Sequence, residues 1–333
     1  MSGARTGEIA SFLAGAGWGG AARRPLTGDA SFRRYERLAL GAQTAILMDA
    51  PPPEDVGRFL AVAELLREAG FAVPAIRAAD DTAGLLLLED FGDDTYTRLL
   101  AEGESELRLY ELATDLLIEL RRRLPIERLS ALPLFDEART IEGLNRFIEW
   151  YWPAVEGVPA PAAAAESFFA AWRSVLPLWE RVPAGLVHYD YHVDNLIMLA
   201  GREGMEAVGL LDFQDAMRGP VGFDLVSLID DARRDVSPAL GARLVERYLA
   251  AFPEQDPVSF AAAYALSGAQ RDTRILGNFA RLLKRDGKPG YLAFVPRVWR
   301  QLEAQLRHPA LAPVASWFDR HFPPHRRRTP EAA

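Results

Sequence analysis

One short stretch of the chain places two carboxylates and an amide at spacings that suit chemistry on a phosphate group. Asp190 and Asn195 lie in one polar segment, and Asp212 follows a later apolar run. Mg²⁺ prefers oxygen ligands and keeps positions open for phosphate oxygens, so an asparagine and an aspartate together suit that ion. These residue types therefore predict a site where a hard cation binds together with phosphate.

The apolar runs that follow Asn195 and precede Asp212 predict an antiparallel hairpin around a glycine-containing turn. If Leu199 lies opposite Val208, the same register places Asn195 opposite Asp212. Opposed residues lie about 5 Å apart at Cβ, which lets their oxygens hold one hard cation. We therefore expect Asn195 and Asp212 to be metal ligands, with Asp190 one loop turn earlier.

The spacing His-x-Asp-x-x-x-x-Asn from His188 to Asn195, with a later Asp-Phe pair at Asp212, resembles the catalytic and metal loops of the kinase-like phosphotransferases. In that pattern the first aspartate accepts the proton of the substrate hydroxyl, and the other two residues bind Mg²⁺ on the phosphates of ATP. The resemblance implies that Asp190 is the catalytic base and that ATP and Mg²⁺ are the cofactors. We expect His188 to order the loop, whereas His192 either packs in the loop or contacts the substrate.

Three further features bring the sequence closer to the aminoglycoside phosphotransferase family than to the protein kinases. Phe-Gln-Asp rather than Phe-Gly follows Asp212, and no Ala-Pro-Glu segment comes after it. The segment Gly222–Leu225 is similar to the downstream Asp-Leu element of that family. The resemblance implies small-molecule substrates, and it gives Asp224 the role of supporting the catalytic loop through hydrogen bonds.

The same resemblance and the coarse periodicity predict an α+β, protein-kinase-like fold with two lobes. The first part is strand-rich, with a hairpin of residues 31–40 and 44–49, a helix at 54–68 and a buried strand at 85–88. Helices dominate the remainder. We expect three parts, namely a nucleotide-binding lobe with a small antiparallel sheet at 1–90, a helical catalytic and substrate lobe at 91–322, and a solvated basic tail at 323–333.

The segment between the first two strands lies where a kinase-like fold covers the phosphates of its nucleotide. Small residues there let the backbone approach phosphate closely. The residues expected to bind the nucleotide are Gly28, Asp29, Ala30, Ser31, Phe32, Arg33 and Arg34, together with Glu89 and Phe91 of a segment that resembles the adenine-reading hinge.

The family's usual lysine on the third strand is missing, because residues 46–49 hold no basic side chain. The two lysines of the chain lie far downstream. Either an arginine supplies the positive charge of the missing lysine to the phosphates, or the metal ion alone supplies it. Arg33 and Arg34 are the nearest candidates, and Glu64 could pair with one of them.

Several segments are similar to one branch of this family, the anomeric N-acetylmuramate/N-acetylglucosamine kinases of bacterial cell-wall (peptidoglycan) recycling. They are residues 28–35, 47–52, 270–271 and 277–282. In that branch ATP phosphorylates the C1 hydroxyl of the amino sugar. One alternative is a kinase of the same family with another acceptor, namely choline, homoserine, fructosamine or an aminoglycoside. The other is a scaffold that binds the nucleotide without turnover, which the absence of the lysine would favour.

Two groups of residues are candidates for the wall that binds the sugar. The first is a basic face on a predicted helix, which would suit an acceptor with a carboxylate such as muramic acid. Its members are Arg271, Arg274, Asn278 and Arg281. The second contains Glu149 and Trp152, since flat rings stack on sugar faces. A solvated helix face and core packing are the respective alternatives.

The composition limits the partners of the chain. It has 333 residues, no cysteine and a formal net charge of −8, which argues against disulfides, thiol chemistry and binding to nucleic acid. No apolar run is long enough for a membrane span, and residues 1–11 lack the basic and apolar regions of a signal peptide. We therefore expect a cytoplasmic monomer, not associated with membranes, that binds ATP and an amino sugar.

Overall fold

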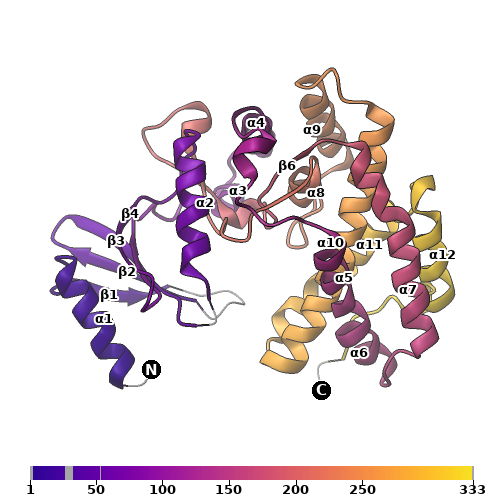
Figure 1. The fold of residues 1–333 in the computed structure, drawn as a ribbon, viewed down its shortest axis with the longest axis horizontal. Helices are drawn as coiled ribbons and strands as arrows, with labels where there is room; N and C mark the ends of the chain where they lie inside the picture. Colours follow the sequence, from indigo (N-terminus) through magenta and orange to yellow (C-terminus); the bar gives the residue numbers. More distant parts are fainter. Residues whose placement is uncertain (1–2, 27–32, 53, 332–333) are drawn as a thin grey trace. The chain divides into compact units, whose positions relative to one another are not determined.

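The structure, a computed structural model, describes residues 3–26, 33–52 and 54–331, and Figure 1 labels its elements. The chain forms two compact units. Unit 1 contains Met1–Glu106 and Val193–Asp215, and unit 2 contains Leu107–His192 and Ala216–Ala333. Unit 1 thus combines the strand-rich first part with a hairpin from the middle of the chain.

A five-stranded antiparallel sheet forms the centre of unit 1, in the order β1-β2-β3-β5-β4. Its strands are β1 (Ala22–Pro25), β2 (Arg34–Leu40), β3 (Gln43–Asp49), β4 (Ile76–Asp80) and β5 (Leu85–Leu88). The predicted hairpin is confirmed as β2 and β3, which turn at Gly41 with a φ of 60°. The predicted buried strand is β5. Helix α1 (Gly3–Gly15) packs its apolar side chains against those of the sheet, and the cluster contains Ile9, Leu13, Trp18, Leu38, Ala45, Leu47, Leu85 and Leu87.

Two further helices and a second small sheet complete the described part of unit 1. The predicted helix is confirmed as α2 (Val56–Glu68), and Asp55 caps it by accepting a hydrogen bond from the backbone N–H of Arg58 (3.1 Å). The second helix is α3 (Tyr96–Ala101). The small sheet pairs β7 (Leu196–Met198) with β8 (Val208–Leu210), and the 3₁₀ turns η4 (Val193–Asn195) and η5 (Gly204–Ala207) precede these strands.

Helices make up most of the described part of unit 2, together with the strand pair β6 (Ala184–Val187) and β9 (Met217–Pro220). The α-helices are α4 (Glu106–Arg123), α5 (Glu137–Arg146), α6 (Trp152–Glu156), α7 (Ala162–Val175), α8 (Phe223–Ile229), α9 (Pro238–Ala250), α10 (Pro257–Asp286), α11 (Val295–Leu306) and α12 (Ala312–His321). A π-helical turn, η2 (Phe147–Tyr151), joins α5 to α6. The 3₁₀ turns are η1 (Ile126–Leu129), η3 (Leu176–Arg181), η6 (Pro289–Phe294), η7 (Pro309–Leu311) and η8 (Pro324–Arg326).

Helix α10 is the central element of unit 2, because most of its side chains are buried. It crosses the end of α5 at Gly277, where a Cβ atom would lie 2.4 Å from the carbonyl carbon of Arg146. Only glycine permits this approach of the two backbones. An aromatic core around Phe147 and Trp317 packs beside α10. None of the described helices combines the length and the apolar character that crossing a membrane requires.

The C-terminal segment is bound to unit 2, so the expectation of a solvated tail is wrong. Arg327 lies between Glu303 and Asp319, with 2.8 Å from a guanidinium nitrogen to an oxygen of each. The hydroxyl of Tyr151 donates a hydrogen bond to the carbonyl of Arg328 (2.6 Å). The arginines that suggested a solvated end instead pair with carboxylates and carbonyls of the helices beside them.

Candidate active site

The loop that carries the predicted base Asp190 follows β6 and is held by a buried carboxylate at the start of α8. Asp224 accepts hydrogen bonds from the backbone N–H groups of His188 (2.6 Å) and Tyr189 (3.0 Å). The Asp224 side chain is buried. Its two bonds fix the orientation of the peptide groups directly before Asp190.

Tyr189, the residue before Asp190, adopts a backbone conformation that a bulky side chain rarely takes. Its φ is 83°, in the left-handed region. Its ring stacks on Phe223 at 6.0 Å between centroids. On α10, Arg274 places its Cζ atom 3.9 Å from the centroid of the Tyr189 ring, and its Nη2 atom lies 3.8 Å from Oδ1 of Asp190. The Asp190 side chain remains 39% exposed, whereas that of Arg274 is 5% exposed. A substrate can therefore reach the carboxylate, and a buried guanidinium supports it.

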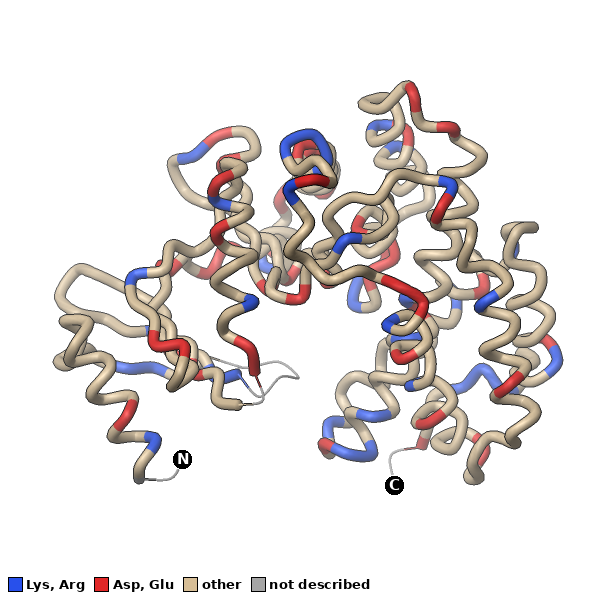
Figure 2. The backbone as a smooth tube through the Cα atoms, in the orientation of Figure 1, with Lys and Arg blue, Asp and Glu red and all other residues tan. Residues whose placement is uncertain are grey.

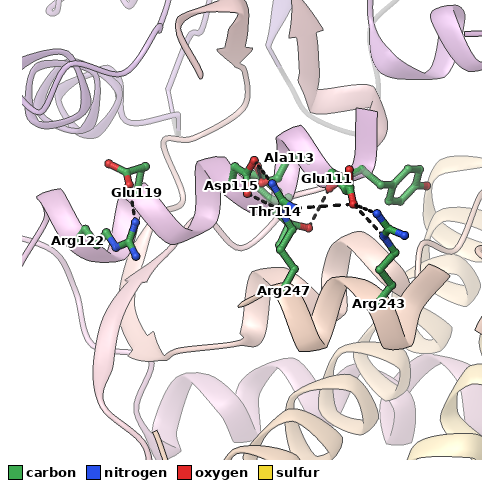
Figure 3. Close-up of polar contacts among 10 residues, drawn as sticks. Glu111, Ala113, Thr114, Asp115, Glu119, Arg122, Arg243 and Arg247 are labelled. Carbon is green, nitrogen blue, oxygen red and sulfur yellow. Dashed lines mark hydrogen bonds and ion pairs between the residues drawn. The ribbon is translucent and has the colours of Figure 1, made fainter. Parts of the chain in front are cut away.

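A second anchor ties the loop to α4. The hydroxyl of Tyr191 donates a hydrogen bond to the carbonyl of Ala113 (2.8 Å), and the Tyr191 side chain is buried. Figure 3 shows how two arginines of α9 reach the acidic side chains of α4 on either side of Ala113. The pairs are Arg243 with Glu111 (2.7 Å) and Arg247 with Asp115 (2.6 Å). The Asp190 loop is thus held by α4 and α8 together.

The two histidines of the loop are buried. His188 is 1% exposed, in keeping with the structural role expected for it. Burial, together with nearby Arg233 and Arg271, lowers the pKa of His192 well below its ordinary value. The His192 imidazole is therefore neutral at neutral pH, which suits packing in the loop and hydrogen bonding more than an ion pair with a substrate.

Burial also raises the pKa of Asp224 to about 7, although the N–H groups of His188 and Tyr189 act in the opposite direction. We expect this shift to appear in the pH dependence of stability. Because the folded pKa of about 7 lies above the unfolded value of 3.8, the folded state holds the proton more tightly. The resulting stabilisation is complete below about pH 4 and is lost as the pH rises toward 7.

Asp224→Asn should remove this contribution, which is on the order of 4 kcal/mol between pH 4 and pH 8. The amide keeps an acceptor oxygen for the loop but does not titrate. Urea unfolding of both proteins across this range measures the difference between their free energies of unfolding. The wild type should lose more stability than the variant as the pH rises, and parallel curves would contradict the shift.

In unit 1, the hairpin β7–β8 has a register one residue away from the predicted one. Val208 lies opposite Met198. The carbonyl of Asn195 accepts a hydrogen bond from the backbone N–H of Leu211 (3.0 Å), so the expectation that Asn195 lies opposite Asp212 is wrong. The 3₁₀ turn η5 runs directly into β8, and the backbone N–H of Leu199 donates to the carbonyl of Ala207 (2.8 Å), so Leu199 lies opposite Ala207 and not opposite Val208.

Asp212 leaves the strand pattern, because its φ of 57° is left-handed. Its Oδ1 atom accepts a hydrogen bond from Nε2 of Gln214 (2.9 Å) and lies 3.2 Å from Nη1 of Arg33. The Nε atom of Arg33 lies 3.1 Å from the carboxylate of Glu54, whereas the sequence suggested Glu64 as a partner for this arginine or its neighbour. Glu54 had not been predicted, because only spatial proximity connects it to Arg33. Gln214 lies two residues after Asp212, but its residue type alone assigned it no role.

The donor set near the hairpin suits a magnesium ion that also binds phosphate. In the part of the chain that the structure describes, no three His, Cys, Asp or Glu side chains gather as a metal site. Asn195 and Asp212 can supply two oxygen ligands, and the Asp212 side chain is 40% exposed. Mg²⁺ commonly takes one or two protein carboxylates and completes its shell with water and substrate phosphates. These residues fit that mode of binding better than a cage made of protein ligands alone.

The predicted phosphate-binding segment is described only from Arg33 onward, since Gly28–Phe32 lie outside the described residues. Arg34 is the exposed first residue of β2 and pairs in the ladder with Asp49 at the end of β3. Arg5 of α1 donates to the Asp49 carboxylate (3.0 Å). Residues 46–49 at the end of β3 therefore include a carboxylate that is paired with Arg5, and they include no basic side chain.

The hinge-like segment is fixed to unit 1 at both of its predicted nucleotide-binding residues. Glu89 exchanges two hydrogen bonds with Ala75, one through its backbone N–H (2.8 Å) and one through its carboxylate (3.1 Å). The Phe91 ring packs on Gly209 of β8, where a Cβ atom would lie 2.8 Å from ring carbons. This contact requires glycine in β8 and connects the hinge to the hairpin that carries Asn195.

The residues predicted to bind the sugar lie in unit 2 in different environments. Arg271 is 3% exposed and donates to the Ser227 hydroxyl (2.8 Å) and the Asp230 carbonyl (2.7 Å). Trp152 is 5% exposed and packs in the aromatic core. Glu149 is exposed on η2. The side chains of Arg271 and Trp152 are thus buried against other residues of unit 2, whereas Arg274 contacts Asp190.

Comparison with known proteins gives a match to the phosphotransferase enzyme family over residues 22–262. An N-acetylmuramate/N-acetylglucosamine kinase from Caulobacter vibrioides is 40% identical, and the similarity covers 98% of this chain and 99% of that protein. A protein of the same name from Pseudomonas aeruginosa is 38% identical over 86% of this chain and 85% of its own length.

Solved structures confirm the predicted kinase-like fold. Choline kinase LicA from Streptococcus pneumoniae has a TM-score of 0.64 at 16% identity, and the superposition covers 92% of this chain and 98% of that one. The ADP-bound aminoglycoside phosphotransferase APH(2'')-Ib has a TM-score of 0.57 at 15% identity, covering 92% and 99%. An antiparallel sheet near the N-terminus followed by a mostly helical part is the architecture that these chains share.

Proposed function

Because the chain belongs to the phosphotransferase enzyme family, we propose that it transfers the γ-phosphoryl group of ATP to the C1 hydroxyl of N-acetylmuramate and N-acetylglucosamine. The observation that carries this proposal is the Asp190 loop, whose backbone is held by Asp224 and whose exposed carboxylate lies beside Arg274. The names of the relatives described above support the choice of acceptor. The requirement for ATP supports a reaction in the cytoplasm, where recycled cell-wall sugars would be reused.

In the proposed reaction Asp190 orients the C1 hydroxyl and accepts its proton. The sugar oxygen forms a bond to the γ-phosphorus while the bond from that phosphorus to the β–γ bridging oxygen breaks, and ADP leaves. Asn195 and Asp212 would hold Mg²⁺, which supplies positive charge to the phosphate oxygens when it is bound. The residues of unit 1 that follow β1 and those of the hinge would hold ATP.

We infer that Arg33 takes over the phosphate-binding role of the absent lysine. Its guanidinium lies beside the predicted metal ligand Asp212, and the fork of a guanidinium group matches the geometry of phosphate oxygens. Arg33→Ala should therefore raise the KM for ATP by about 10-fold or more, since a hydrogen bond to a charged group contributes about 1.5–3 kcal/mol. The KM for the sugar should change little.

Steady-state kinetics with ATP varied at saturating sugar measure this effect. Arg23→Ala is the matched control, because the Arg23 guanidinium pairs with Glu36 on the same sheet. An unchanged KM for ATP in Arg33→Ala would show that Arg33 does not bind the phosphates and that the metal ion alone neutralises them.

The acceptor is tested by release of ADP across a panel of N-acetylmuramate, N-acetylglucosamine, choline and kanamycin. We expect turnover with the two amino sugars and an acid-labile product, since an anomeric phosphate hydrolyses readily in acid. Turnover with choline or kanamycin alone would identify a different kinase, and ATP binding without turnover on any acceptor would indicate a nucleotide-binding scaffold.

A further inference from the structure

We propose that Arg146 and Arg281 form an anion subsite that binds the carboxylate of N-acetylmuramate. This inference rests on the proposed function, because it concerns how the same site tells its two sugars apart. N-acetylmuramate carries a carboxylate on the lactyl ether at C3, and N-acetylglucosamine does not. The two acceptors therefore differ by one anionic group, which a pair of guanidinium groups can recognise.

The backbone crossing at Gly277 brings the two arginines together. It places the end of α5 directly against α10. The Nη1 atom of Arg146 donates a hydrogen bond to Oδ1 of Asn278 (2.9 Å). Arg281 lies three residues after Asn278 on α10 and is therefore its neighbour on the same helix face. Figure 2 shows that basic residues recur along the C-terminal half of this helix.

The charges around Arg281 favour an added anion. Burial and then the positive charge of Arg146 lower the pKa of Arg281, so the two guanidinium groups repel one another. Among the described residues, no acceptor bonds to the buried Nε atom of Arg281. Glu149 is the nearby carboxylate on η2, and it is exposed; Asp286 pairs with Arg285 (2.7 Å). A ligand carboxylate would relieve the repulsion and accept the available N–H groups.

The subsite lies within reach of the predicted base in unit 2. Arg274 contacts Asp190, and Asn278 stands one turn further along α10, about 6 Å away at 1.5 Å per residue. Arg281 lies about 10 Å from Arg274 along the same axis. The lactyl group is separated from C1 by part of one sugar ring, so this spacing suits a sugar whose C1 hydroxyl meets Asp190.

The other arginines of the predicted basic face have different partners. Arg271 is bonded to Ser227 and to the Asp230 carbonyl, and Arg274 lies between the Tyr189 ring and Asp190. The face therefore divides into a buried structural arginine, an arginine that supports the base, and an outer part, Asn278 and Arg281, that meets Arg146 of α5 and can receive a ligand.

The test compares Arg281→Gln and Arg146→Gln with the wild type on both sugars. We expect kcat/KM for N-acetylmuramate to fall about 10- to 100-fold, the loss of one charge-assisted hydrogen bond, and kcat/KM for N-acetylglucosamine to change less than about 2-fold. Arg281→Lys should restore part of the activity on N-acetylmuramate. Arg285→Gln is the matched control, since it removes a guanidinium from the same helix end that is paired with Asp286.

The outcomes separate this inference from the proposed function. A wild type that turns over neither sugar contradicts the proposed function. A wild type active on both sugars, with variants that lose both activities equally or lose neither, overturns the anion subsite. Titration calorimetry of N-acetylmuramate supplies a reading without turnover: the dissociation constant should rise about 10- to 100-fold in Arg281→Gln, and an unchanged constant would overturn the subsite as well.

Discussion

Asp190→Asn should lower kcat at least about 100-fold and leave the binding of ATP unchanged, because general bases contribute about 10²- to 10⁴-fold to rates of this kind. The amide is nearly the same size as the carboxylate but cannot accept the proton of the C1 hydroxyl. Asp224 bonds the peptide groups before residue 190 rather than its side chain, so the loop should keep its shape. The loss is therefore expected in kcat and not in nucleotide affinity.

Single-turnover and steady-state assays with N-acetylglucosamine measure this loss, and calorimetry with ADP or ATP measures nucleotide binding. Asp235→Asn is the control, since its exposed carboxylate pairs with Arg297 and Arg300 of α11. Near-normal turnover in Asp190→Asn would remove Asp190 from the chemistry. A parallel loss of nucleotide binding would point instead to a misfolded loop.

Asp212→Ala should reduce activity at least about 100-fold at a fixed magnesium concentration, because a metal ion at the phosphates stabilises the transition state by several kcal/mol. The substitution also removes an acceptor from Arg33 and Gln214. The diagnostic quantity is therefore the dependence of rate on Mg²⁺, which should shift to much higher concentrations, and not the rate alone.

Asp215→Ala is the matched control for this variant. Asp215 is the next carboxylate along the chain, it is half-exposed, and it lies 3.7 Å from Arg58. Its replacement should leave the magnesium dependence close to that of the wild type. If Asp212→Ala showed an unchanged magnesium dependence, Asp212 would not be a metal ligand.

Elements with a strong local pattern could be predicted from the sequence. The hairpin β2–β3 and helix α2 have apolar side chains at strand and helix spacing, and glycine or a capping aspartate marks their ends. Strands β1 and β4 were missed, because their side chains are mostly exposed and give no alternation of apolar and polar residues. Their position in the sheet depends on backbone pairing with β2 and β5.

The candidate site shows where a sequence pattern stops being informative. Residue types and spacing made Asp190, Asn195 and Asp212 candidates, but they could not fix the register of the hairpin, which differs by one residue from the predicted one. The left-handed backbone at Tyr189 has no signature in that residue type, and aspartate, which takes this conformation more often, only permits it at residue 212. Arg271 appeared to lie on a polar helix face, yet α10 is enclosed on most sides, so helical spacing alone could not separate a buried arginine from an accessible one.

The order of the chain through the two units has a consequence for protein engineering. Unit 1 is not a continuous stretch of sequence, since residues 193–215 return to it after the chain has entered unit 2. A chimera that keeps unit 1 and exchanges unit 2 with that of a relative therefore needs breakpoints near residues 106, 192 and 215. Simple recombination at one crossover would separate Asn195 and Asp212 from the sheet with which they form a unit.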